Sequence, residues 1–181
     1  MRWDRLFDDL EAQLELEESR ELEAEVADRT RRERAQLDLQ SRLLANQGAT
    51  VGARLGSGVL TGAVVDVGPD WLLLETRPEW PVLVSLAALR SVTGLAPGAI
   101  AATTVARRFA LGSALRAVSR DRATVALTDV DARVTVGTID VVGADHLESS
   151  EPASDEVRRA SNVVACHLVP FTAIESVRRL R

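Results

Sequence analysis

The N-terminal segment carries a helical pattern of apolar and polar positions. No glycine or proline occurs between Trp3 and Arg32, and leucine, glutamate, alanine and arginine, which favour helices, dominate it. Glutamates concentrate early and arginines late, which suits the helix dipole. We therefore predict an amphipathic helix in residues 1–33. Its apolar residues recur at three- and four-residue intervals and form one stripe, consisting of Trp3, Leu6, Phe7, Leu10 and Leu14.

A different pattern follows a short helical stretch at 39–46. Val51, Ala53 and Leu55 alternate with small or polar residues, as in a strand that buries one face. Turns rich in glycine, proline or aspartate then separate short apolar runs. These runs predict successive strands, which cover residues 51–55, 59–67, 71–74, 82–86 and 89–92.

The same pattern occurs twice along the chain. Residues 62–71 align with 137–146 at an offset of 75, and residues 84–92 align with 169–177 at an offset of 85. The offset changes inside a polar, proline-containing stretch near 148–160, which predicts a loop insertion in the second copy. We therefore expect an internal duplication.

These patterns divide the chain into four regions. The N-terminal helix occupies 1–33, a first unit of helix and short strands occupies 34–95, an apolar linker spans 96–107, and a second unit comprises 108–181. The second unit opens with a short helix at 113–119. Because the linker is apolar, we expect it to run across a surface. Short strands leave edges that one small unit cannot cover, so we expect the units to pack as a pseudo-two-fold pair.

Three features of each unit point to a known fold. A helix precedes the first strand, Gly62 is followed by Val64 in the second strand, and Trp71–Leu74 forms an apolar third strand. With these features each unit resembles an Sm-like barrel of the LSm and Hfq type. The chain also resembles uncharacterised actinobacterial proteins with a VGADWLLL…VLVPLAAL pattern. The resemblance implies a mainly β protein with an N-terminal α-helix and two tandem Sm-like or SH3-like small barrels.

The resemblance to Sm-like proteins also implies RNA binding as an alternative function. Sm proteins that hold uridines use an Asp-x-x-x-Asn loop, whereas Gly68 and Asp70 occupy that region here without an asparagine. Ala87-Ala88 stands where the second Sm motif carries Arg-Gly. In this alternative, loop arginines would contact the nucleic acid, and the candidates are Arg54, Arg77, Arg122 and Arg133.

Charge favours a protein partner over a nucleic acid. The formal net charge is −5, and the 12 Asp and Glu against 6 Arg of residues 1–33 alone give −6. The remainder is nearly balanced and lacks the basic surplus that is typical of phosphate binding. An exposed apolar stripe on the N-terminal helix would be rare in a monomer. We expect the stripe to be buried on a barrel, on a second copy or on a partner. The alternative is a solvated helix docked on the rest of the chain.

Histidine and cysteine are too scarce to predict a catalytic or metal site. His146 and His167 have no further ligands at metal-binding spacing. Cys166 neighbours His167 along a strand, so the two side chains should point to opposite faces. We interpret Cys166 as a buried structural residue that has no disulfide partner within the chain.

Two further motifs are interpreted as turns. Gly56, Gly58 and Gly62 do not have the spacing of a dinucleotide-binding loop and precede a strand, not a helix. Several aspartates recur beside glycines in both copies, so we expect them to cap turns. These aspartates are Asp66, Asp70, Asp140 and Asp145.

The sequence therefore predicts a protein-interaction or regulatory module without enzymatic activity or cofactor. Its expected partner is another protein or a second copy of the chain. The apolar runs are too short to span a membrane, and no signal peptide is recognised, so we expect a soluble, cytoplasmic protein. An Sm-like nucleic-acid-binding regulator is the alternative, and an enzyme acting on a small molecule is a third class.

Overall fold

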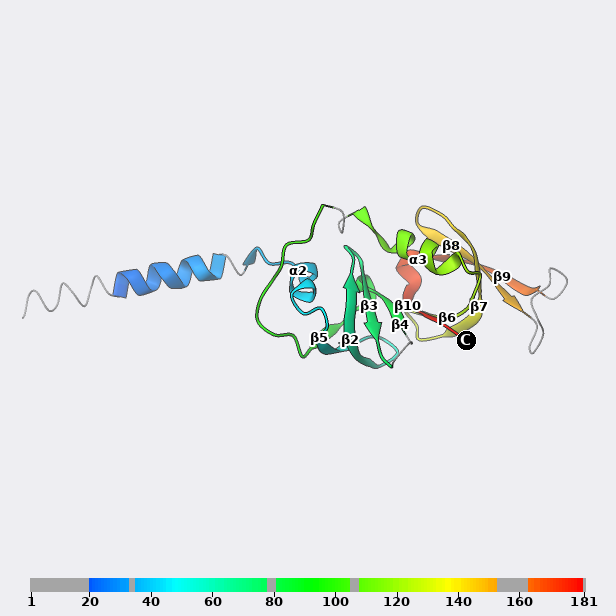
Figure 1. Cartoon of the computed structure of the whole chain (residues 1–181), viewed down its shortest axis with the longest axis horizontal. Helices are drawn as coiled ribbons and strands as arrows, with labels where there is room; N and C mark the ends of the chain where they lie inside the picture. The colour runs from blue at the N-terminus through cyan, green and yellow to red at the C-terminus, as the bar shows by residue number, and fades with distance from the viewer. Residues whose placement is uncertain (1–19, 33–34, 78–80, 105–107, 153–162, 181) are drawn as a thin grey trace, which may run out of the picture. The chain divides into compact units, whose positions relative to one another are not determined.

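The computed structural model describes residues 20–32, 35–77, 81–104, 108–152 and 163–180 (Figure 1). The chain forms two compact units, residues 1–38 and residues 39–181.

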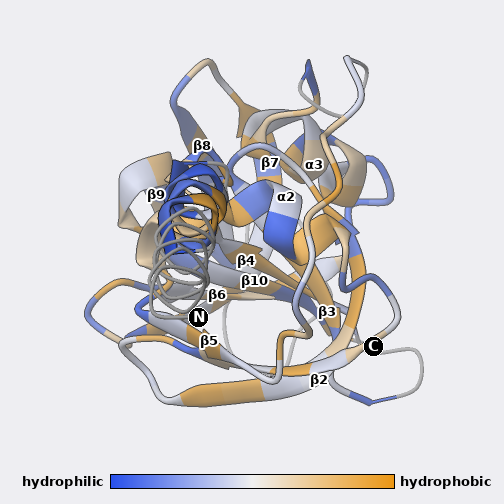
Figure 2. Ribbon diagram, turned by 90° about the vertical axis from the view of Figure 1, so that its left-hand side faces the viewer, coloured by the Kyte–Doolittle hydropathy of each residue, from blue (hydrophilic) through white to orange (hydrophobic). Residues whose placement is uncertain are grey.

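In the first unit, residues 20–32 form an α-helix, which confirms the helix predicted for this part of the chain. Its surface is mostly hydrophilic (Figure 2), and Leu22 and Val26 are exposed on it. Arg31 pairs with Asp28 at 3.3 Å, one turn earlier. The apolar stripe from Trp3 to Leu14 lies outside the described residues, so its burial stays a prediction.

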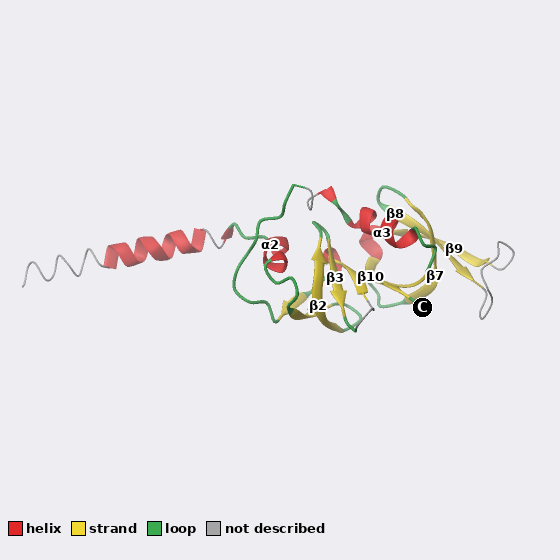
Figure 3. Cartoon of the chain, viewed as in Figure 1, coloured by secondary structure: helices red, strands yellow, loops and turns green. Residues whose placement is uncertain are grey.

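The second unit is mainly β (Figure 3). Its described helices and 3₁₀ turns are α2 (Leu39–Leu44), η1 (Leu86–Ala88), α3 (Leu111–Ser119) and η4 (Phe171–Ala173). Its first five strands are β1 (Thr50–Arg54), β2 (Val59–Val67), β3 (Trp71–Glu75), β4 (Pro81–Ser85) and β5 (Ser91–Thr93). The next five are β6 (Thr124–Asp129), β7 (Val134–Val142), β8 (His146–Pro152), β9 (Val163–Pro170) and β10 (Ile174–Arg179).

All ten strands belong to one antiparallel sheet. Its order is β5-β1-β2-β3-β4-β10-β6-β7-β8-β9, and no described strand pair joins β9 back to β5. The mainly β prediction is therefore confirmed. The prediction of two tandem small barrels is not confirmed, because the described strands form one sheet that does not close, in which β4 and β10 share a ladder.

The two sets of strands meet through unlike members. β4 is the fourth strand of the first set and β10 the fifth strand of the second, and they pair through Ser176–Val84, Val177–Leu83 and Arg178–Val82. A two-fold axis would have to pair like strands. The pseudo-two-fold packing that we predicted is therefore wrong, and the arrangement is head-to-tail. We call this ladder, with the contacts around it, the inner junction.

Each set of strands surrounds its own apolar core. The first core gathers side chains from α2 and β1–β4, including Leu43, Leu72 and Leu74, all fully buried. The second core gathers α3 and β6–β10, and it also contains Trp71 from β3 and Leu83 from β4. The first set therefore contributes two large side chains to the second core, which ties the halves together by apolar burial as well as by strand pairing.

Similar local features occur in both sets. The β2–β3 ladder shifts register between Val64 and Asp66, and the β7–β8 ladder shifts between Ile139 and Val141. Bulges of this kind bend a sheet sharply. Gly62 and Gly137 lie just before these bends, where a Cβ would press against a carbonyl oxygen of the facing strand. Glycine is therefore required at both positions.

The segment after β5 runs over α2, as its apolar composition predicted. The Ala96 N–H donates to Asn46 Oδ1 at 2.7 Å, and the Ile100 N–H donates to the Ser41 carbonyl at 2.9 Å. The polar stretch predicted as a loop near 148–160 differs in part. Residues 148–152 belong to β8, and residues 153–160 of the predicted loop lie outside the described residues.

Candidate protein-interaction site

The outer side of β9, at one end of the sheet, is a candidate surface for strand pairing. Among the described residues, β9 pairs only with β8, although it extends over 8 residues. β5 likewise pairs only with β1 at the opposite end of the sheet. Edge strands of this kind present backbone N–H and C=O groups to any strand that approaches. We call the outer side of β9 the open edge.

An apolar side chain lies exposed on the open edge. Leu168 of β9 is 64% exposed, whereas Leu83, which aligns with it at an offset of 85, is 4% exposed. Leu83 is buried because β10 pairs with β4 and the second core closes over it. The two leucines therefore differ in what covers them.

A cavity of about 680 Å³ lies beside the open edge. Residues 166–170 of β9 form one wall, and the β6–β7 turn with Asp129 and Arg133 forms another. Glu151 also lines it, and its carboxylate lies 3.2 Å from the Nε2 atom of His167. The cavity thus combines an open backbone edge, an apolar leucine and several ionisable groups.

At the inner junction, residues around the start of β3 form hydrogen bonds with the start of α3 and with the residue that precedes it by two positions. The Leu111 N–H at the start of α3 donates to Asp70 Oδ1 at 2.7 Å. The indole N–H of Trp71 donates to the Phe109 carbonyl at 2.6 Å. The Asp70 carboxylate therefore provides an acceptor for one of the N–H groups that have no intrahelical partner at the start of a helix.

A buried carboxylate lies at the same junction. Glu175, 1% exposed, directly precedes the part of β10 that pairs with β4. It accepts hydrogen bonds from the N–H of Ser57, at 3.1 Å, and from the Ser57 hydroxyl. A Cβ on Gly56 would lie 2.9 Å from Glu175 Oε2, so the turn between β1 and β2 fits closely around the carboxylate. These two donors offset the cost of burying a charge.

The residues that align with Asp70 and Trp71 have no such contact with a helix. Asp145 is 91% exposed at its side chain and lies 2.9 Å from the Nδ1 atom of His146. The hydrogen bond from His146 lowers the pKa of the Asp145 carboxyl below its ordinary value of 3.8. Asp145 therefore lies at the surface beside a half-buried His146. At the inner junction, by contrast, Asp70 accepts from the start of α3 and Trp71 donates to the residue two positions before it.

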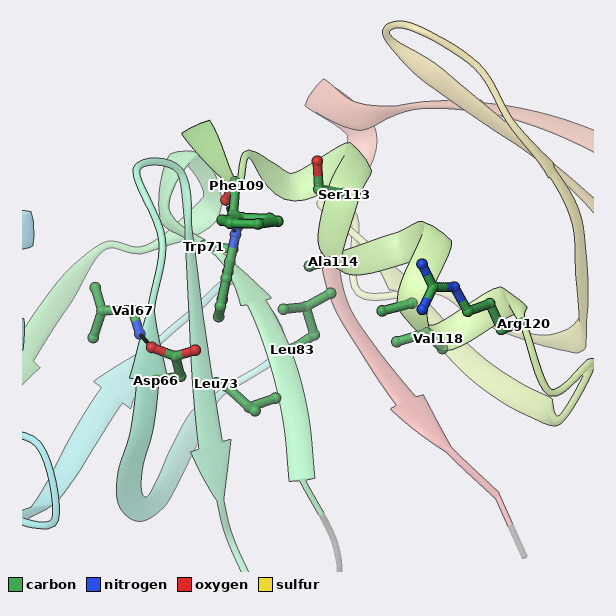
Figure 4. A pocket seen from close by; sticks show the side chains of 11 residues that line it. Asp66, Val67, Trp71, Leu73, Leu83, Phe109, Ser113, Ala114, Val118 and Arg120 are labelled. Carbon is green, nitrogen blue, oxygen red and sulfur yellow. Dashed lines mark hydrogen bonds between the residues drawn. The ribbon is translucent and has the colours of Figure 1, made fainter. Parts of the chain in front are cut away.

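A second depression lies between β3, β4 and α3, with a volume of about 490 Å³. Figure 4 shows Trp71, Leu83 and Val118 along it, with Asp66 and Arg120 at its two ends. The groove belongs to the inner junction, because it is bounded by strands of the first set and by the helix of the second.

The four arginines proposed for nucleic-acid contact lie in separate segments. Arg54 ends β1 and donates to the Ser91 hydroxyl at 3.0 Å, whereas Arg77 follows β3. Arg122 lies in the turn after α3, and Arg133 lies in the turn before β7. The cavity beside the open edge contains Arg133 alone of these four.

Two predictions about individual side chains need correction. Cys166 is exposed, not buried. Of the repeated aspartates, Asp70 binds the start of α3 and Asp140 accepts a hydrogen bond from Ser150 across the ladder, so neither simply caps its own turn. The turn-capping aspartate that we missed is Asp129, which accepts from the N–H groups of Asp131 and Arg133.

Comparison with known proteins yields no relative for this chain. Neither a scan of protein-family models nor a search of curated proteins finds a match. In the described part of the chain, no three His, Cys, Asp or Glu residues gather as metal ligands would. No described helix has both the length and the apolar character needed to cross a membrane.

Proposed function

We propose that the chain is a non-enzymatic protein-interaction module whose partner is a second copy of itself. Each copy would add its β5 to the open edge of β9 on the next copy. This proposal includes a duplication: β1–β5 and β6–β10 are two versions of one five-stranded unit. The inner junction is then the template for the contact between chains.

Matching hydrogen bonds support the equivalence of the two units. The Gly68 N–H donates to the Trp71 carbonyl, and the Gly143 N–H donates to the His146 carbonyl, both at 2.9 Å. The Leu86 N–H at the start of η1 donates to the Asp70 carbonyl at 2.9 Å. At the start of η4, the Phe171 N–H donates to the Asp145 carbonyl at 2.8 Å.

The order of strands identifies the complementary surfaces. The inner junction joins a fourth strand, β4, to a fifth strand, β10, and the two strands at the ends of the sheet are the other fifth strand, β5, and the other fourth strand, β9. The exposed side of β9 thus corresponds to the side of β4 that binds β10. The ends of one chain are complementary to the ends of the next.

The alignment also predicts the register between chains. Transferring the β4–β10 pairs by the offset of 85 places Ser91 opposite Val169, Val92 opposite Leu168 and Thr93 opposite His167. The exposed Leu168 would then be covered as Leu83 is covered by β10. This difference in the burial of two aligned leucines is the observation that carries the proposal.

A head-to-tail contact has a consequence for the size of the assembly. Because the contact joins unlike surfaces, every added copy presents a new open edge, and growth stops only when the last copy meets the first. The expected products are closed rings or open filaments. Two-fold dimers are not expected.

Cross-linking tests the proposed register directly. Cysteines replacing Val92 and Leu168, in a Cys166→Ser background, should form disulfides between chains under mild oxidation. Directly opposed residues of antiparallel strands have Cα separations of about 4.5–5.5 Å, which a disulfide can bridge. We expect a ladder of covalent multimers on a denaturing gel.

A matched control distinguishes disulfides formed in the proposed register from disulfides formed by random collision of two exposed cysteines. Val65 on β2 is also exposed, at 46%, but lies on an interior strand of the sheet. Cysteines replacing Val65 and Leu168 should give no ladder. Equal cross-linking of both pairs, or a wild-type chain of monomer mass by light scattering at high concentration, would contradict the proposal.

The nucleic-acid alternative is tested separately. If the module instead binds RNA through its arginines, retention on RNA should weaken steeply with salt and should decrease when Arg54 and Arg133 are replaced together. Association between chains that is unaffected by added RNA would favour the protein-interaction proposal. The N-terminal stripe is a second candidate contact, and deletion of residues 1–32 tests its contribution to the mass of the assembly.

A further inference from the structure

The two fifth strands, β5 and β10, differ in the charge of the residue that precedes the Ser-Val pair in each. On β10, Glu175 directly precedes Ser176 and Val177, and on the first unit Arg90 directly precedes Ser91 and Val92. Arg90 is exposed, and its backbone N–H donates to the Arg54 carbonyl at 2.9 Å. The fifth strand that is already paired therefore carries a carboxylate, and the one at the free end carries a guanidinium.

The turn that receives Glu175 is built for an anion. Ser57 supplies both its N–H and its hydroxyl to the carboxylate. Around the point where a Cβ of Gly56 would stand, the Arg90 Nη2 atom lies at 3.6 Å, the Val130 carbonyl oxygen at 3.1 Å and Glu175 Oε2 at 2.9 Å. Donors and positive charge therefore surround Glu175 at the inner junction.

The corresponding turn beside the open edge is built differently. Its N–H groups are already used within the turn, because those of Asp131 and Arg133 donate to Asp129 Oδ1 at 3.0 and 2.9 Å. The Ala132 N–H donates to the Asp129 carbonyl at 2.9 Å. This turn has no such donor left for a carboxylate.

The charge around that turn is also opposite in sign. Asp129, Asp131 and Glu151 contribute three carboxylates on or beside the cavity, against the single guanidinium of Arg133. His167 completes the ionisable groups in this region. With the histidine neutral, a strand arriving at β9 meets a net charge of about −2.

We propose that Arg90 determines which strand the open edge accepts, an inference that rests on the head-to-tail assembly proposed above. Arg90 of an arriving chain lies at the acidic β6–β7 turn and is attracted by it. A β10 strand from another copy would place Glu175 against the same carboxylates, where the backbone N–H groups of the turn already donate to Asp129. The open edge therefore selects β5 and rejects β10, which prevents strand exchange between chains.

Charge reversal with rescue tests this inference. Arg90→Gln and Asp131→Arg should each weaken association between chains, and Asp131→Arg should weaken it more, roughly tenfold or beyond, because it places like charges together. The double variant Arg90→Glu with Asp131→Arg should regain most of the loss. Association is measured by sedimentation over a concentration series, with the salt dependence recorded for each variant.

Arg90 also lies near Glu175 within its own chain, so a folding defect must be separated from a binding defect. Asp131 is exposed, but its neighbour Val130 lies beside Gly56, where the Val130 carbonyl oxygen would be 3.1 Å from a Cβ. Urea unfolding of every variant, Asp131→Arg included, therefore separates a folding defect from a binding defect. Arg77→Gln removes an equally exposed arginine from another loop and should leave association unchanged.

The outcomes distinguish this inference from the proposed function. If Leu168→Arg dissociates the chains while Asp131→Arg and Arg90→Gln leave association intact, the assembly stands and the role of Arg90 is overturned. If the wild-type chain does not associate, the proposed function fails first. Weakening by both single changes, with rescue in the double variant, supports the inference.

Discussion

The inner junction and the open edge contain aligned residues in different surroundings. Leu83 and Trp71 are buried at the junction, whereas Leu168 is exposed on the open edge and the side chain of His146 is 32% exposed. The aligned carboxylates differ as well, since that of Asp70 accepts from the start of α3 and that of Asp145 lies 2.9 Å from the ring of its neighbour His146. The same local chain geometry therefore forms part of a core in one place and a surface in another, depending on whether a neighbouring strand is present.

The largest expected difference concerns Trp71 and His146. Replacing Trp71 by alanine removes a large side chain from the second core and its hydrogen bond to Phe109, and should cost roughly 3–5 kcal/mol of unfolding free energy. His146→Ala should cost about 1 kcal/mol or less, because the histidine is smaller than Trp71 and its side chain is 32% exposed. Urea denaturation of both variants measures the difference. Equal losses would show that the open end is as well packed as the junction.

Glu175 provides the next contrast. Glu175→Leu removes the acceptor of two hydrogen bonds and leaves the Ser57 donors without it, so we expect a loss of roughly 1.5–3 kcal/mol. Arg90→Leu, at the aligned position, should have a smaller effect on unfolding because Arg90 is exposed. Thermal unfolding at low protein concentration gives both values. A larger loss from Arg90→Leu would contradict this order.

Asp70 and Asp145 test the helix contact. Asp70→Ala deprives the first N–H of α3 of its acceptor and should cost about 0.5–2 kcal/mol, as the loss of other helix caps does. Asp145→Ala removes an exposed carboxylate from a surface pair and should leave the unfolding free energy nearly unchanged. Amide exchange at Leu111 and Gly112 reports the Asp70 effect locally. Exchange that is unaltered at both residues would exclude the capping role.

The smallest effect is expected from pH. Because the folded-state pKa of Asp145 is lowered by the hydrogen bond from His146, the pair stabilises the fold above the unfolded-state pKa. This contribution is lost as the pH falls through the folded-state pKa. An NMR titration of His146→Gln should return the Asp145 pKa towards 3.8. An unchanged titration in the variant would assign the lowering to another group.

Local features of the fold were predictable from the sequence because they depend on neighbouring residues. Alternation of apolar positions indicated the strands, and the absence of glycine and proline indicated the helix seen over 20–32. The glycine turns at 56–58 and 68–70 also lie where the pattern placed them, between consecutive strands. Each of these features is determined within a few residues of chain.

The inner junction was not predictable in the same way. Nothing in the pattern of β4 states that its neighbour is β10, because the pairing depends on how two bent sets of strands meet in space. The role of Asp70 is another example, since its partner Leu111 lies 41 residues away. Cys166 was misassigned because its exposure depends on which face of β9 the rest of the fold covers, and the strand sequence alone does not show this.

The segment that crosses α2 between β5 and α3 also has a consequence for affinity. It tethers the two sets of strands, so the contact between β4 and β10 forms at an effective concentration on the order of millimolar, whatever the amount of protein in solution. A contact with the same chemistry between separate chains has no such advantage. Cutting this segment with a protease would make the inner contact bimolecular, and dilution could then separate fragments that the uncut chain holds together at any concentration.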